Sequence, residues 1–371
     1  MTTLPRVLVT GASGKTGTAT VFALIEHHSD AVQVRALVRR DDHRARALRE
    51  AGAEVVFGDL SDIRDVRRAM KDVQRAHFLA AITNSSLDHA VNFAVAASEQ
   101  DLEHVTALGQ WLSSDSHPSV LTRRTWLIDQ LLTWIPGVDH TVINMGFLAD
   151  NFMSMLGTAA QMGMLPLPLG SGSTAPISNE DIGRVVAAVL ANPTPYAGRT
   201  LRPTGPEILT PEDMAAVFGE VLGREVKYSE GSEKMLLKSF RALGRSPFEL
   251  AQVVHYMREF RRGAFLSGGT TDVVQEVTGR PAEDFAAITR RYAASDPMAQ
   301  RSFPNRLRAM AQMAKILLTP VPDIDASLRD AGVPVIDGED CVDHEEWNRT
   351  HDLPNAFGVG RTLSKVASFP S

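Results

Sequence analysis

The stretch Arg6–Gly17, R-V-L-V-T-G-A-S-G-K-T-G, decides the fold of this chain. Its first half contains Val7–Thr10, a short apolar and β-branched run that is typical of a strand buried on both faces. Three glycines follow at intervals of three residues, and residues 18–28 then carry apolar side chains at helical spacing. The pattern predicts a strand, a glycine-rich turn and a helix.

Such a turn can hold a diphosphate, because glycines let the backbone approach the phosphates and the first helical turn offers unpaired N–H groups. The spacing G-x-x-G-x-x-G differs from the G-x-G-x-x-G of dehydrogenases, but its position after the first strand favours dinucleotide binding over a turn without ligand. A P-loop would need a glycine at Val9, which excludes that triphosphate site. The predicted cofactor-binding residues of the turn are Gly11, Ser13, Gly14, Lys15, Thr16 and Gly17.

The end of the second strand, expected at residues 31–38, predicts the kind of dinucleotide. In dinucleotide-binding folds an acidic residue here binds the ribose hydroxyls, whereas an arginine accommodates a 2′-phosphate. The strand ends in Arg39 and Arg40, so Arg39 favours NADP(H) over NAD(H). A solvated charged turn is the alternative, since Asp41 and Asp42 follow directly.

Two further strand ends are expected to reach the cofactor, because α/β folds bind ligands at the carboxyl ends of their strands. Asp59 and Leu60 follow the third strand; Asp59 could accept a hydrogen bond from the adenine amino group, or it could cap the next helix. Ala81 ends the fourth strand, expected at residues 76–82, and Asn84 lies in the loop that would pass the nicotinamide.

Strands and helices alternate regularly through the first half of the chain, which predicts an α/β, Rossmann-type doubly wound parallel sheet with a small C-terminal lobe and an extra C-terminal tail. We expect a dinucleotide-binding core at 1–155, the rest of the domain with the substrate lobe at 156–297, and an extension at 298–371. The Pro- and Gly-rich stretch at 165–173 is expected to be a loop over the site.

The extension begins with an amphipathic helix, expected at residues 305–318, and continues into an acidic segment. We expect it to wrap the body, to mediate association into a homo-oligomer, or to be partly disordered. Cys341 is followed by acidic residues and a histidine, H-E-E-W-N from His344, which does not match H-E-x-x-H or another zinc pattern. The sequence therefore predicts no metal site.

Composition excludes several functions. The chain has 371 residues, 44% of them hydrophobic and 22% charged, as in ordinary globular proteins. Its net charge of −6 argues against binding to nucleic acid or anionic membranes. With one cysteine it can form no internal disulfide, and neither a signal peptide nor an apolar run of membrane-spanning length is visible. We expect a cytoplasmic protein.

From about residue 5 to 293 the chain resembles the NmrA-like group of atypical short-chain dehydrogenases/reductases. The resemblance rests on V-T-G-A-S-G-K-T-G, on V-R-R and G-A-E-V-V-F-G-D-L, and on P-I-S-N-E-D-I-G, T-G-P-E-I-L-T-P-E-D-M-A, L-G-R-E-V-K-Y and V-T-G-R-P-A-E-D-F. It implies a cofactor domain and a small second lobe with a small-molecule substrate between them. It also implies an NAD(P)H-dependent oxidoreductase that transfers hydride to a carbonyl, quinone or conjugated substrate, or alternatively a non-catalytic NADP(H)-binding redox sensor.

The active-site residues depart from the wider superfamily, since none of the tyrosines has a lysine four residues on. The candidate catalytic residues are His117, on the loop after the fifth strand, and Arg124, near the position where family members can carry a lysine. A histidine side chain titrates near neutrality, and an arginine can polarise a carbonyl. A helix-entry loop and a solvated helix face are the alternatives. The candidate substrate pocket consists of Gln110, Met145, Phe147 and Asn151, the last matching a family asparagine expected to fix a loop over the nicotinamide.

Overall fold

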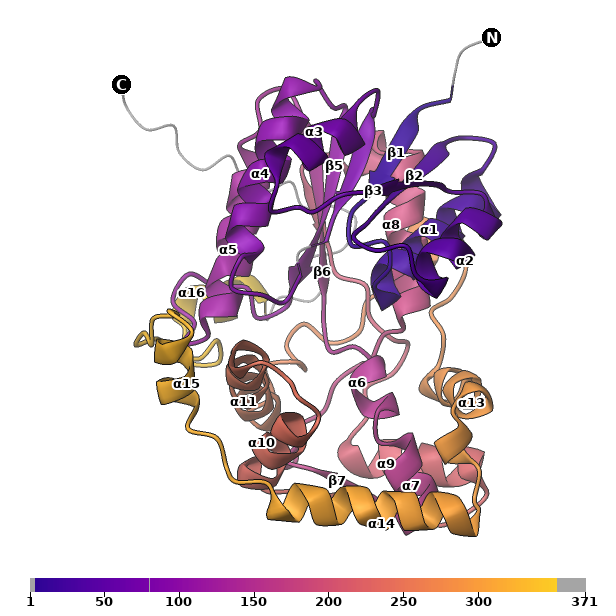
Figure 1. Cartoon of the computed structure of the whole chain (residues 1–371), viewed down its shortest axis with the longest axis vertical. Coiled ribbons are helices and arrows are strands. Elements are labelled where there is room, and N and C mark those ends of the chain that lie inside the picture. Colours follow the sequence, from indigo (N-terminus) through magenta and orange to yellow (C-terminus); the bar gives the residue numbers. More distant parts are fainter. Residues whose placement is uncertain (1–3, 80, 352–371) are drawn as a thin grey trace.

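The computed structural model describes residues 4–79 and 81–351. Its upper lobe in Figure 1 is built on a seven-stranded parallel sheet with the order β3-β2-β1-β4-β5-β6-β8, so the predicted α/β doubly wound fold is confirmed. The strands of this sheet are β1 (Arg6–Val9), β2 (Gln33–Val38), β3 (Glu54–Phe57), β4 (Arg75–Phe78), β5 (His104–Gln110), β6 (Asp139–Met145) and β8 (Arg199–Leu201).

Helices cover both faces of the sheet because successive residues of its buried strands point to opposite sides. Val7 and Val9 of β1 pack into one apolar core and Leu8 into the other. The first face is covered by α1 (Lys15–His28), α2 (His43–Ala51), α8 (Asn179–Ala191) and α12 (Val273–Thr278). The second face is covered by α3 (Ile63–Met70), α4 (Ser86–Glu99) and α5 (Val120–Thr133).

The lower lobe has its own core of aromatic and aliphatic side chains, which includes Phe152, Phe218 and Phe260. Its elements are α6 (Asp150–Met153), α7 (Leu156–Met162), β7 (Met164–Leu167), α9 (Pro211–Leu222), β9 (Lys227–Glu230), α10 (Glu233–Ala242), α11 (Pro247–Arg261), α13 (Phe285–Ser295) and η2 (Pro297–Ala299), whereas the 3₁₀ turn η1 (Thr194–Tyr196) packs on the sheet core through Tyr196. The expected loop at 165–173 is therefore wrong in its first part, because β7 pairs in parallel with β9.

Two other boundaries differ from the sequence-based expectation. Strand β4 ends at Phe78, because the N–H of Leu79 is taken by the hydroxyl of Thr10 at 3.0 Å and the strand pairing stops there. Helix α8 and strand β8 return to the sheet after the start of the lower lobe, so residue 155 does not separate two independent bodies.

The extension wraps the body, as Figure 1 shows in its yellow and orange segments. Helix α14 (Phe303–Leu318) lies along the lower lobe, and α15 (Ile324–Asp330) and α16 (Glu345–His351) continue to the level of α5. Helix α14 leaves Phe303, Leu307 and Leu318 largely exposed, and association through this extension stays a prediction. None of the helices in the described ranges has the length and apolar character that a membrane span requires.

Candidate functional site

The glycine-rich turn opens helix α1 without a side-chain cap. Gly14 precedes the helix, its N–H bonds Gly11 O at 2.9 Å, and its carbonyl accepts from Thr18 N–H at 2.8 Å. Within the described residues, the N–H groups of Lys15, Thr16 and Gly17 have no hydrogen-bond partner. Three unpaired amides at the positive end of a helix dipole form a site for an anion such as a diphosphate.

Two of the glycines are required by the backbone itself. Gly11 has φ +60°, and a Cβ there would lie 3.0 Å from Leu79 Cδ2. A Cβ on Gly17 would lie 2.3 Å from the carbonyl oxygen of Gly11, closer than any real contact. The sharp turn that aims the α1 amides outward therefore depends on the absence of side chains at both positions.

A buried amide stands beside this helix terminus. The Thr16 hydroxyl donates to Asn179 Oδ1 at 2.6 Å, so the Thr16 side chain is engaged within the protein. Asn179, at the start of α8, is 4% exposed, and its Nδ2 has no partner among the described residues. An unpaired buried donor is costly unless a ligand satisfies it, and phosphate oxygens accept such bonds.

At the end of β2 both aspartates form ion pairs, whereas Arg39 forms none among the described residues. Asp42 caps α2 and pairs with Arg44, whose hydrogen bond lowers the Asp42 pKa to about 2, and Asp41 pairs with Arg49 at 3.6 Å. In the part of the chain that the structure describes, Arg39 is exposed and forms no hydrogen bond or ion pair. Its guanidinium therefore stays available for a phosphate, and the role of Arg39 in cofactor choice stays a prediction.

Sequence reasoning missed Arg44. Its Nη1 donates to Ser13 O at 3.4 Å, which places a second guanidinium directly on the glycine-rich turn. Arg44 follows two aspartates in the sequence, so the residue order suggests that its charge is neutralised by them on a surface helix. Only the three-dimensional structure brings Arg44 to Ser13.

Asp59 lies at the carboxyl end of β3 with its side chain turned into its own loop. Its Oδ1 accepts from Ser61 N–H at 2.8 Å, and this bond, with a contribution from nearby Arg39, lowers the Asp59 pKa. The alternative that Asp59 caps the next helix is wrong, because Asp62 is the cap of α3. The carbonyl of Leu60 accepts from Asn92 Nδ2 at 2.8 Å, which fixes this edge.

Arg124 and Asn84 meet at the loop after β4. Arg124 Nη1 donates to the carbonyl oxygen of Asn84 at 2.5 Å and to its Oδ1 at 2.7 Å, while Ala81 O accepts the N–H of Thr83 at 2.9 Å. Burial lowers the Arg124 pKa, and its guanidinium lies 5.7 Å from the Phe248 ring centroid. Arg124 thus positions the loop expected beside the nicotinamide.

His117 lies away from any open surface. It is fully buried, its Nδ1 accepts from Ser119 N–H at 3.0 Å, and its Nε2 is 3.5 Å from Glu259 Oε1. The predicted role in proton transfer to a substrate therefore conflicts with the structure, in which the extension covers this loop: Glu339 N–H bonds Ser116 O at 2.9 Å.

His117, Glu259 and Cys341 form a buried cluster whose ligand atoms lie within 4.8 Å of one another. The N–H of Ser119 points at Nδ1 of His117, so in the neutral ring the proton sits on Nε2, facing Glu259. A metal would need that lone pair. His117 Nε2 forms no hydrogen bond among the described residues, and the Glu259 carboxylate accepts instead from the backbone N–H groups of Cys341 and Val342.

Of the four predicted pocket residues, Gln110 and Met145 lie side by side, whereas Phe147 is in the core and Asn151 is exposed. Gln110 Oε1 accepts from the Tyr256 hydroxyl at 2.5 Å, and the half-buried Met145 ends β6 beside it. Phe147 is 5% exposed and belongs to the aromatic core, 5.1 Å from Phe152 between ring centroids. Asn151 is exposed, whereas its neighbour Asp150 makes the contact with Lys15 that the sequence did not reveal.

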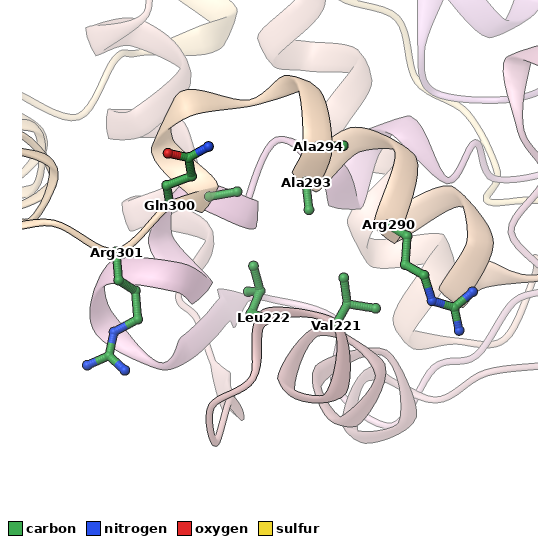
Figure 2. A pocket seen from close by; sticks show the side chains of 8 residues that line it. Val221, Leu222, Arg290, Ala293, Ala294, Gln300 and Arg301 are labelled. Carbon is green, nitrogen blue, oxygen red and sulfur yellow. The ribbon is translucent and has the colours of Figure 1, made fainter.

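A pocket of about 460 Å³ lies elsewhere, between α9 and the end of α13 (Figure 2). Arg290 and Arg301 stand at its rim, and Val221 and Leu222 line it. Its lining comes from α9, α13 and the segment that follows α13, and no residue of the glycine-rich turn lines it.

Residues 11–193 match the family described as NAD(P)H-binding, and residues 134–277 match the NmrA-like family. The chain is 27% identical over 291 residues to the NAD(P)H azoreductase of Xenophilus azovorans, covering 78% of this chain and 98% of the relative. It is 28% identical over 288 residues to the (4-alkanoyl-5-oxo-2,5-dihydrofuran-3-yl)methyl phosphate reductase of Streptomyces griseus, covering 77% and 98%.

Among solved structures, the NADPH-dependent quinone oxidoreductase of Escherichia coli, complexed with NADPH, superposes with a TM-score of 0.67 at 20% identity. The match covers 77% of this chain and 99% of that chain. This likeness supports the fold. Part of the present chain has no counterpart in these three proteins.

Proposed function

The chain belongs to the NmrA-like family of NAD(P)H-binding atypical short-chain dehydrogenases/reductases, and from this premise we propose that it is an NADPH-dependent reductase of a small conjugated acceptor. The acceptor would be a quinone, an azo compound or an α,β-unsaturated carbonyl compound. Hydride would pass from the nicotinamide to an electrophilic atom of the acceptor.

One observation carries the cofactor part of the proposal: three unpaired amides open α1 beside the orphaned amide of Asn179. A diphosphate would satisfy these donors together. Arg39, which forms no ion pair in the described ranges although it lies near the Asp59 carboxylate, supports a phosphorylated ribose and hence NADPH over NADH.

The residues around the expected nicotinamide suit an acceptor that needs little help from the protein. A bound nicotinamide would supply the hydride, and the anion that hydride addition leaves on the acceptor would take a proton from water. Arg124 holds the loop after β4 at Asn84, and Tyr256 holds the side chain of Gln110 at the end of β5. These contacts would keep the residues beside the acceptor in fixed positions. Conjugated acceptors fit because their π-systems delocalise the incoming electrons.

The relatives agree with this choice of substrate class. The azoreductase and the dihydrofuranone phosphate reductase are both named for conjugated substrates, and the aligned region spans 98% of each. The quinone oxidoreductase supports the same class by fold alone.

The test begins with binding. NADPH and NADH are titrated separately by calorimetry, and NADPH absorbance is then followed with azo dyes, quinones and enones as acceptors. We expect tighter binding of NADPH and turnover of at least one acceptor class. Binding of neither dinucleotide by folded protein would refute the proposal at its base, and tight NADPH binding without turnover of any acceptor would refute the reductase.

A redox sensor that binds NADP(H) without turnover is the second candidate. It is favoured by the burial of His117 and by the covering of the loop after β5 by the extension. A sensor must distinguish NADPH from NADP⁺. Equal affinities for the two forms, together with turnover of an acceptor, would exclude it.

A further inference from the structure

Three segments that are distant in the sequence meet at the carboxylate of Asp150. The Lys15 ammonium, on the first residue of α1, bonds its Oδ2, and the Tyr292 hydroxyl from α13 bonds its Oδ1. The Lys15 Nζ also lies 5.6 Å from the centroid of the Tyr292 ring. Asp150 is the first residue of α6, in the loop after β6, so this contact joins the glycine-rich turn to the lower lobe.

The contact belongs to a closed ring of interactions around the start of α1. Thr16 bonds Asn179 of α8, and the next residue, Glu180, pairs with Arg291 of α13. Arg291 lies directly before Tyr292, and its guanidinium is 5.4 Å from the Tyr292 ring centroid. The chain of contacts thus runs α1–α8–α13–α6 and returns to α1 through Lys15.

Two of the unpaired amides of α1, those of Lys15 and Thr16, and the orphaned Nδ2 of Asn179 belong to residues of this ring. The side chain of Lys15 is 70% exposed, whereas that of Asp150 is 11% exposed, so the lysine is the mobile partner and the aspartate the fixed one. An ammonium has three donor hydrogens, which allows Lys15 to keep its bond to Asp150 while donating to a phosphate oxygen.

We propose that Lys15 and Asp150 form a clasp across the diphosphate of the bound dinucleotide, with Tyr292 holding Asp150 in place, and that opening of this clasp sets the rate of dinucleotide release. The clasp rests on the proposed function, since it requires NADP(H) in the groove. Asp150 and Tyr292 act through Lys15 and are positioning residues.

The test measures dinucleotide release directly. Protein loaded with NADPH is mixed in a stopped-flow instrument with excess NADP⁺, and the loss of the bound NADPH fluorescence gives the dissociation rate. Loss of one charge-assisted hydrogen bond should accelerate release about tenfold in Lys15→Met and somewhat less in Asp150→Asn. Tyr292→Phe keeps the ring and should accelerate release about threefold.

Lys227→Met is the matched control, because the Lys227 side chain is 73% exposed and pairs with Glu225 at 3.1 Å on β9. It should release NADPH at the wild-type rate. In the double variant Lys15→Met/Asp150→Asn, the effects should not multiply, because both substitutions break one contact.

The outcomes separate the two proposals. Wild-type protein that binds no dinucleotide overturns both the function and the clasp. NADPH binding with wild-type release rates in Lys15→Met and Asp150→Asn overturns the clasp alone. Multiplying effects in the double variant would likewise show two independent contributions in place of one clasp.

Discussion

The hydroxyl of Thr16 donates a hydrogen bond of 2.6 Å to the side chain of Asn179, although 163 positions separate them in the chain. This bond joins the turn that opens α1 to the start of α8, and both residues are buried. The two helices pack so closely that a Cβ on Gly183 would lie 2.6 Å from the backbone of Ala19. The cofactor turn is therefore braced by a helix from the second half of the chain.

Substitution Gly17→Ala should destabilise the protein and abolish dinucleotide binding. The new methyl group would overlap the carbonyl oxygen of Gly11, so the turn must open, at a cost of about 2–4 kcal/mol. Thermal unfolding and NADPH calorimetry measure the two effects. Gly146→Ala is the control, because nothing lies within 4 Å of its added Cβ. Wild-type affinity in Gly17→Ala would disprove the assigned turn geometry.

Substitution Arg39→Glu should reverse the coenzyme preference. The unengaged guanidinium would be replaced by a carboxylate that repels a 2′-phosphate and can accept from ribose hydroxyls. The ratio of NADPH to NADH affinity should fall about 10- to 100-fold, as expected for one charge-assisted contact. Arg49→Glu, which disturbs only the pair with Asp41, should leave the ratio unchanged. An unaltered ratio in Arg39→Glu would assign the phosphate to another residue, such as Arg44.

Asp129 should make the protein less stable as the pH rises. Its Oδ1 is buried without a hydrogen-bond partner among the described residues, and burial raises its pKa to about 7. Between about pH 4 and pH 7 the unfolded chain releases this proton while the folded protein retains it, so stability falls with rising pH across that window.

Asp129→Asn removes this titration and should stabilise the protein at pH 8 by about 1–3 kcal/mol, less than the full shift implies because the residue is only half-buried. Near pH 4 Asp129→Asn should be no more stable than the wild-type protein. Urea unfolding of both proteins at pH 5 and pH 8 measures it, with the exposed Asp115→Asn as control. Equal pH profiles for wild type and Asp129→Asn would contradict the raised pKa.

Substitution Glu259→Ala should loosen the extension. The fully buried carboxylate accepts the N–H of Cys341 through Oε1 and that of Val342 through Oε2 at 3.4 Å, and it faces His117. Its removal leaves buried donors unpaired, at a cost of about 3–5 kcal/mol. Cys341 is buried in the wild-type protein, and in Glu259→Ala its thiol should react faster with a thiol reagent.

The exposed Glu276→Ala serves as the comparison for Glu259→Ala and should change neither stability nor thiol reactivity. If the Cys341 thiol stayed protected in Glu259→Ala, the extension would be held mainly by other contacts, such as Arg262 with Asp343.

Much of the fold could be predicted because its evidence is local. The apolar run of β1, the three glycines and the helical spacing after them are adjacent in the sequence, and each follows from backbone sterics. The extent of β7 was missed because its pairing partner β9 lies far along the chain, and a strand with a proline and a nearby glycine has the composition of a loop.

The site was predicted where one segment forms it and missed where several do. Gly11 and Gly17 were identified from the turn, whereas Asp150 and Tyr292 carry no motif, and only the structure brings them together with Lys15. His117 has the side chain and the sequence position of a catalytic residue, but the extension buries it, and burial is a property of the whole chain.

The sequence by itself determined the doubly wound sheet, the glycine-rich turn before α1 and the exposed arginine after β2, since these depend on residues within a few positions of one another. The tertiary structure alone decided which side chains meet Lys15 beside that turn, that His117 is buried, and where the extension lies. Those properties depend on contacts between distant segments, and their energies arise only when packing excludes water and places the charges together.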